Sequence, residues 1–187
     1  MRLVSSSQEK SVETSRFQYH PLRESWLLPM AQTNNVTRML VAKGIAFEAH
    51  ELPEEKLGGV EAAAVLNVDP QHVFKTIVAI RPDGGKPVLA LIPAPAQLDL
   101  KAIGRLLGSK KLQVASQLQA EKMTSLQVGG ISPLALVGKG FEVVIDEKAL
   151  ALEKIYLSGG QRGLNFSMTP QAVIGLTHAK VGEISSV

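Results

Sequence analysis

The sequence of 187 residues contains no cysteine, and this absence excludes several kinds of site. Disulfides, thiolate nucleophiles and cysteine-ligated metal ions are impossible, so any reaction at a thiol must use a thiol that the substrate brings. Histidine is scarce as well, because His20, His50, His72 and His178 stand apart without the spacing of a metal-binding pair. We therefore expect no metal ion and no cofactor.

Long apolar runs are also missing. The longest, residues 88–96, is interrupted by Pro93 and Pro95 and falls far short of the roughly 20 residues that span a bilayer. The 20 basic and 17 acidic residues give a net charge of +3, without the dense clustering of basic residues typical of a dedicated nucleic-acid binder. These features predict a cytoplasmic protein with no membrane contact and no DNA partner.

The length and the 45% hydrophobic content fit one core and fall short of two ordinary domains. Residues 1–29 are polar, carry no apolar periodicity and lack the apolar centre and cleavage site of a signal peptide. We expect them to form a disordered tail, or to precede the working start at Met30. Residues 30–187 then form the folded domain.

Apolar periodicity and capping signals predict an interleaved set of helices and strands in that domain. Helices are expected after caps at Asn34 or Asn35, Asp99, Ser116 and Thr169, and over residues 60–66. Strands are expected over residues 45–49, 73–80, 88–92, 141–145, 155–158 and 164–168. Because no regular βαβ repeat emerges, we predict an α/β (α+β) fold: a single domain with a mixed, mostly antiparallel sheet and packed helices.

Lys75 is unusual because it lies inside an apolar strand, VFKTIVAI. Lysine is rarely buried without a partner. It could lie on the solvent face of an edge strand or extend past the sheet rim, or it could present a cation to a phosphate or carbonyl oxygen of a ligand.

Two glycine-rich segments follow. In Val128-Gly129-Gly130-Ile131-Ser132-Pro133 the glycines would let backbone N–H groups approach a ligand, although a plain connecting turn fits as well. In Ser158-Gly159-Gly160-Gln161-Arg162-Gly163 the arginine could bind phosphate with two hydrogen bonds, or lie exposed on a hairpin turn. Neither segment matches the G-x-S-x-G pattern of a serine hydrolase.

Four motifs in order, VFKT (73–76), AQLDLKAIGRLLGSKK (96–111), VGGISPL (128–134) and IYLSGGQRGL (155–164), closely resemble the YbaK/EbsC family. The resemblance covers nearly all of the chain from about Met30 onward. It implies a single α/β domain related to the editing domain of bacterial prolyl-tRNA synthetases. It also implies an enzyme that releases amino acids esterified to the 3′ end of tRNA, with prolyl-tRNA synthetase as a candidate partner.

Matched motif by motif, the resemblance places the family lysine at Lys75, its threonine neighbour at Thr76, and a G-x-x-x-P loop between Gly129 and Pro133. We expect the backbone amides of Gly130, Ile131 and Ser132 to stabilise an oxyanion. The other expected substrate-binding residues are Gly159, Gly160, Arg162 and Asn165.

In YbaK itself the preferred substrate is Cys-tRNA(Pro), whose own thiol is thought to attack the ester and leave a thiolactone. YbaK-like sequences often carry a tyrosine, a phenylalanine and an aspartate where this chain has Leu52, Gly58 and Asn165. The resemblance therefore implies a deacylase that acts in trans and releases cysteine from tRNA(Pro) with the help of the substrate thiol. A water-mediated deacylase for another small amino acid and a non-catalytic module that binds tRNA ends or a synthetase are the alternatives.

Overall fold

The computed structural model describes residues 16–19 and 33–186. The helices in this part of the chain are α1 (Asn35–Ala42), α2 (Gly59–Leu66), α3 (Leu100–Leu107), α4 (Gln117–Thr124) and α5 (Pro170–Thr177). The strands are β1 (Arg16–Tyr19), β2 (Phe47–Glu51), β3 (Phe74–Ile80), β4 (Val88–Pro93), β5 (Gln97–Leu98), β6 (Gln113–Val114), β7 (Glu142–Asp146), β8 (Ile155–Ser158), β9 (Leu164–Met168), β10 (Lys180–Gly182) and β11 (Ser185–Ser186). Every helix expected from the sequence is present, each within a residue or two of its expected start.

The strands form three sheets, in the orders β1-β2-β9-β8, β10-β7-β4-β3-β6 and β11-β5. Two strand pairs, β7 with β4 and β7 with β10, are parallel, and the others are antiparallel. The prediction of an α/β fold with mixed, mostly antiparallel pairing is confirmed. The sequence did not predict the short strands β5, β6, β10 and β11, because two or three residues carry no readable period.

The caps read from the sequence explain where the helices begin. Asn34 accepts a hydrogen bond from the Thr37 amide at 2.9 Å, and Ser116 and Gln119 form a reciprocal capping box at the start of α4. Each satisfies N–H groups that the first helical turn leaves unpaired.

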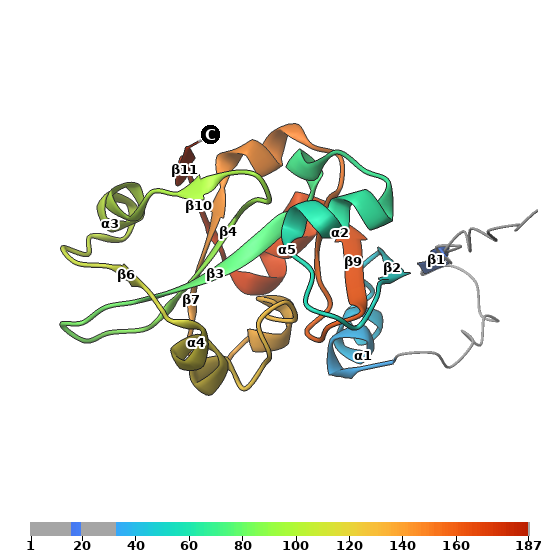
Figure 1. Ribbon diagram of the computed structural model, residues 1–187, viewed down its shortest axis with the longest axis horizontal. Helices are drawn as coiled ribbons and strands as arrows, with labels where there is room; N and C mark the ends of the chain where they lie inside the picture. The colour runs from blue at the N-terminus through green and yellow to red at the C-terminus, as the bar shows by residue number, and fades with distance from the viewer. Residues whose placement is uncertain (1–15, 20–32, 187) are drawn as a thin grey trace, which may run out of the picture.

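The centre of the larger sheet is β4, whose six residues are all buried. It pairs with β3 as an antiparallel hairpin and with β7 on its other edge. A continuous apolar strand of this kind is expected where both faces of a sheet are covered. In Figure 1, α3 lies beside β6 and β10 at one end of the sheet, and α2 crosses in front of it near the four-stranded sheet.

A backbone bridge links the two main sheets, which also share one apolar core. Val73, just before β3, forms a parallel bridge with Tyr156 of β8. This contact sets β3 beside the four-stranded sheet, and the edge of β3 beyond it borders the site described below.

Residues 16–19 form β1, which pairs antiparallel with β2 in register from Arg16 opposite His50 to Tyr19 opposite Phe47. The sequence analysis did not predict this strand, because the alternation of polar and aromatic residues in RFQY covers only four positions of an otherwise polar segment. The rest of that segment, residues 1–15 and 20–29, lies outside the described residues. The assignment of residues 30–187 as the folded domain stays a proposal.

We predict that a chain beginning at Met30 folds with a melting temperature within about 4 °C of the full chain, roughly 1 kcal/mol for a domain of this size. The reason is that β2 keeps its pairing with β9 when β1 is removed. Differential scanning calorimetry of the two chains checks this. A larger decrease would show that β1 contributes substantially to the domain.

Among the described residues, no helix is both long and apolar enough to cross a membrane.

Candidate functional site

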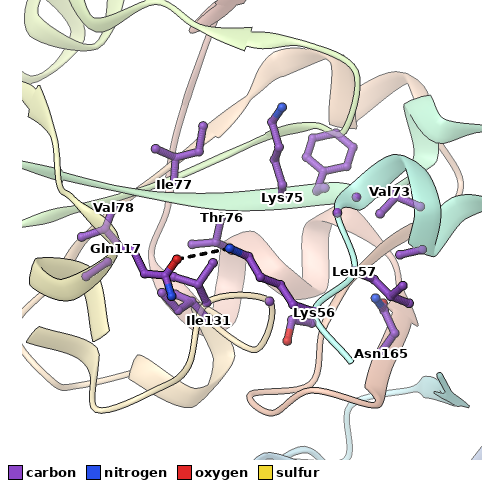
Figure 2. A pocket seen from close by; sticks show the side chains of 18 of the residues that line it. Lys56, Leu57, Val73, Lys75, Thr76, Ile77, Val78, Gln117, Ile131 and Asn165 are labelled. Atoms are coloured by element: carbon purple, nitrogen blue, oxygen red, sulfur yellow. Dashed lines mark hydrogen bonds between the residues drawn. The ribbon is translucent and has the colours of Figure 1, made fainter. Parts of the chain in front are cut away.

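A cavity of about 470 Å³ opens along β3, where the start of α2, the start of α4, the 128–131 loop and the ends of β8 and β9 meet (Figure 2). Its walls are mostly apolar. The lining residues are Lys56, Leu57, Gly58, Gly59, Ala62, Val73, Phe74, Lys75, Thr76, Ile77, Val78, Val114, Ala115, Gln117, Ala120, Val128, Gly129, Ile131, Ser158 and Asn165.

The edge of β3 that borders the cavity carries backbone groups without a neighbouring strand. Val73 C=O accepts from Ala94 on the β4 side, whereas Val78 C=O accepts from Ala115 on the opposite side. Backbone groups alternate in direction along a strand, so the N–H and C=O of Thr76 point away from β4. There they face the gap between the bridge at Val73 and the pairing of Ala79 with Val114. A ligand in the cavity can therefore form hydrogen bonds with this edge.

Lys75 lines the same cavity, on the face of β3 opposite Thr76 (Figure 2). Its Nζ donates to the Ala94 carbonyl at 2.8 Å, and an ammonium has three donors. Burial lowers the pKa of Lys75 below the usual lysine value, because the charged form loses hydration. The side chain is thus half-buried and held by one carbonyl, with donors left for an oxygen of a ligand.

Part of the 128–133 loop lines the cavity, and the rest of it is buried in the interior. Gly129 (φ +94°) and Ile131 line the cavity. Gly130 is buried and its N–H donates to the Gln127 carbonyl at 2.8 Å. Ser132 is fully buried, and its Oγ accepts from the Leu134 amide at 3.3 Å. Pro133 is the N-cap of a 3₁₀ turn (Leu134–Leu136) behind the cavity wall.

This loop is braced by the 158–163 turn. A Cβ on Gly130 would lie 2.8 Å from the Gln161 carbonyl carbon, so only glycine allows this approach. Arg162 Nε donates to the Val128 carbonyl at 2.9 Å. The arginine expected to bind phosphate therefore holds the loop in the structure.

Gly159 and Gly160 lie beside α1 rather than in the cavity wall. Asn34 Nδ2 donates to the Gly159 carbonyl at 2.8 Å. A Cβ on Gly160 would come within 2.9 Å of the Ala135 Cβ. Of the site residues expected from the sequence, Lys75, Thr76, Gly129, Ile131 and Asn165 line the cavity, and Gly130, Ser132, Pro133, Gly159, Gly160 and Arg162 lie around it.

Asn165 is the most informative polar group in the wall. Its side chain is 6% exposed, and its Oδ1 is buried without a hydrogen-bond partner in the described part of the protein. A buried unsatisfied acceptor costs about 1–3 kcal/mol. Buried groups of this kind occur at functional sites, and the Asn165 side chain lines the cavity.

Sequence reasoning missed Lys56 and Gln117. Lys56 Nζ donates to Gln117 Oε1 at 3.2 Å across the cavity (Figure 2). The two residues are far apart in the sequence and belong to no recognised motif. Leu52 and Gly58, where the family often carries aromatic residues, lie near the cavity: Gly58 lines it, and Leu52 packs with Val73 and Tyr156.

A Ser-His-Glu cluster lies behind the wall. Ser167 Oγ is 3.0 Å from His50 Nε2 and donates to Glu48 Oε2 at 3.4 Å. These are the residue types of a hydrolase triad. Ser167 is 1% exposed and does not line the cavity, so its hydroxyl has no path to an ester bound there.

Within the residues that the structure describes, no three histidines or carboxylates gather in a way that could hold a metal ion. The cavity lining also contains no histidine, aspartate or glutamate.

The family model of the aminoacyl-tRNA editing domain matches residues 55–176, which span the whole cavity. The chain belongs to this family. Family membership makes it an aminoacyl-tRNA editing and deacylase-type protein. The lysine, the glycine loop and the serine–glycine turn identified from the sequence all fall inside the matched region.

Several relatives share the domain. The chain is 30% identical over 157 residues to EbsC of Enterococcus faecalis, a candidate Cys-tRNA(Pro)/Cys-tRNA(Cys) deacylase, covering 83% of this chain and 94% of that protein. It is 24% identical over 125 residues to the proline–tRNA ligase of Streptococcus mutans, covering 66% of this chain but only 20% of the ligase.

Solved structures show the same fold. The crystal structure of hypothetical protein APE2540 matches with a TM-score of 0.75 at 25% identity, over 82% of this chain and 100% of that one. A candidate trans-editing enzyme for prolyl tRNA synthetase matches with a TM-score of 0.68 at 22% identity, over 84% of this chain and 100% of that one.

Proposed function

We propose that this protein is a deacylase that acts in trans and releases cysteine from tRNA(Pro), using the thiol of the substrate as the nucleophile. The observation that carries this proposal is the composition of the cavity wall. It offers a cation, backbone donors and an acceptor, but no histidine or carboxylate that could activate water or a hydroxyl.

The reaction requires no nucleophile and no general base from the residues of the cavity wall. The thiol of the cysteinyl group attacks its own ester carbonyl, forming a C–S bond and a cyclic thiolactone. The C–O bond breaks, and the terminal ribose hydroxyl leaves with the proton of the thiol. An intramolecular nucleophile has a high effective concentration, and a thiol is partly ionised at neutral pH.

The protein then has two tasks, to hold the ester and to stabilise the developing oxyanion. The Gly130 N–H is already engaged in its turn, and Ser132 is fully buried outside the cavity lining. We therefore assign the second task to the backbone N–H of Ile131, which lines the cavity. Each donor of this kind is worth about 10²–10³ in rate. Lys75 binds an oxygen of the terminal ribose or phosphate.

Asn165 and the edge of β3 provide the remaining contacts. The α-ammonium of an aminoacyl ester is a donor that fits the buried, unpaired Asn165 Oδ1, and the backbone of Thr76 is available to the adenosine or the ester. Prolyl-tRNA synthetase, whose Streptococcus mutans form contains a related segment, is the proposed protein partner.

We predict that cysteine is released from tRNA more than about tenfold faster than serine, a difference of at least 1.36 kcal/mol in the barrier. Serine differs only in the nucleophile, and a hydroxyl is barely ionised at neutral pH. Deacylation of the same tRNA charged with each amino acid, with product analysis for thiolactone, checks this.

Equal release of the two amino acids, or free cysteine without thiolactone, would favour attack by water. If neither amino acid is released but the uncharged tRNA binds measurably, the result would favour a non-catalytic module.

A further inference from the structure

A second hollow of about 680 Å³ lies on the flank of α3 and under the segment that follows it. We call it the basic cleft. It is lined by Leu100, Lys101, Gly104, Arg105, Gly108, Ser109, Lys110, Lys111, Leu112 and Gln113. Four of these residues are cations and none is a carboxylate.

The four cations of the basic cleft, Lys101, Arg105, Lys110 and Lys111, are exposed. None of them forms an ion pair with another described residue. The nearest acid in the sequence is Asp99, whose carboxylate accepts from the backbone amides of Lys101 and Ala102 as the cap of α3. The pKa of Asp99 is lowered first by the hydrogen bond from the Ala102 amide, and the charges of Arg105 and Lys101 also lower it. Within the described part of the chain, the uncompensated positive charge of the cleft is therefore mainly that of Lys110 and Lys111.

The segment that carries Lys110 and Lys111 is held in place by backbone contacts. Ser109 N–H donates to the Gly104 carbonyl at 2.9 Å. A Cβ on Gly104 would lie 2.8 Å from the Ser109 carbonyl oxygen, so glycine at 104 permits this packing. The lysines thus extend from a fixed turn, which lowers the entropic cost of binding a ligand.

The basic cleft adjoins the cavity across β6. Gln113 lines the cleft and Val114, the other residue of β6, lines the cavity. Both are held against the end of β3, and Val114 is 52% exposed. In Figure 1 α3, β6 and the far end of the β3–β4 hairpin lie together on the left of the molecule.

We propose that the basic cleft binds the sugar-phosphate backbone of the tRNA acceptor stem while the aminoacylated 3′ end occupies the cavity. This inference rests on the proposed function. The cavity accommodates about one nucleotide and its amino acid, so the preceding phosphates must leave through its mouth. The exposed strand β6 lies between the mouth of the cavity and the four cations of the basic cleft. Positively charged side chains of this kind bind the phosphates of nucleic acids.

The test is the pair of substitutions Lys110→Gln and Lys111→Gln in one chain. The probe is an uncharged RNA hairpin with the sequence of an acceptor stem and its single-stranded 3′ end, whose binding is measured by fluorescence anisotropy at several salt concentrations. We expect affinity to fall about tenfold at low salt. The slope of log K against log salt concentration should decrease by about 1.5, since each lost phosphate contact removes about 0.7–0.9.

The matched control is Lys43→Gln, an exposed lysine at the end of α1. It should bind the hairpin like the unchanged protein. If the double variant also binds like the unchanged protein, with the same salt slope, or if the unchanged protein does not bind the hairpin, the proposal is overturned.

A second readout separates this inference from the proposed function. With mischarged tRNA the double variant should show a higher KM and an unchanged kcat, and with an aminoacyl ester of adenosine it should equal the unchanged protein. If the double variant loses activity on the aminoacyl ester of adenosine, Lys110 and Lys111 do more than bind the acceptor stem, which would contradict the proposal. If no ester is cleaved by any form, the proposed function fails, but the hairpin measurement still decides whether the basic cleft binds RNA.

Discussion

Replacing Lys75 with alanine should reduce deacylation of mischarged tRNA by about 100-fold or more, the scale of one electrostatic contact in a preorganised site. The melting temperature should change by less than about 4 °C. Removing the side chain loses one hydrogen bond to the Ala94 carbonyl, but it also removes a cation whose pKa is lowered by burial. These two effects on the free energy of unfolding oppose each other.

Lys75→Arg distinguishes a specific ammonium site from simple positive charge. Lys75 Nζ donates to the Ala94 carbonyl at 2.8 Å, and a planar guanidinium on a different stem does not reproduce the contacts of a compact ammonium, so we expect poor rescue. Lys86→Ala, at the exposed turn of the β3–β4 hairpin, is the control and should keep full activity. Near-normal turnover of both Lys75 variants would show that Lys75 is only a strand residue.

Asn165→Leu should raise stability while lowering activity. Leucine has a similar size and removes a buried acceptor without a partner, so we expect the free energy of unfolding to rise by about 1–3 kcal/mol. Loss of a hydrogen bond to the charged α-ammonium, worth about 1.5–3 kcal/mol, should slow deacylation by about 10- to 100-fold. Urea denaturation and single-turnover deacylation provide the two measurements.

Ser167→Ala is the matched control for Asn165. Ser167 is also buried on β9, but its hydroxyl contacts His50 and Glu48. Its removal should lower the free energy of unfolding by about 0.5–1.5 kcal/mol and leave deacylation unchanged. If Asn165→Leu is destabilising and fully active, Asn165 does not bind the substrate.

Much of the local structure follows from short-range signals in the sequence. The caps at Asn34, Asp99, Ser116 and Thr169 mark the helix starts because each side chain satisfies amides within three residues. The apolar run at residues 88–92 predicts a strand, and the structure has it as β4, with all six residues buried. The strand at residues 16–19 has no such signal, since its pairing with β2 is a long-range contact.

The chemical content of the site was also readable. The lysine within an apolar strand and the two glycine-rich segments were recognised in the sequence, and they lie in or around the wall of one cavity. The absence of cysteine excludes a thiol nucleophile from the protein. The sequence could not show which backbone groups are free. The Gly130 N–H is used in a local turn with the Gln127 carbonyl, which a glycine pair does not reveal by itself. Arg162 binds the Val128 carbonyl, a contact between residues 34 positions apart.

The sequence by itself determined the family, the α-helices, the longer strands and the lack of a thiol nucleophile in the protein, because these depend on residue identity and on local hydrogen bonding. Only the tertiary structure decided that Asn165 is a buried acceptor without a partner and that Lys56 reaches Gln117. It also set the basic cleft next to the cavity through β6. Burial and adjacency arise from the packing of strands distant in sequence, and no local pattern records them.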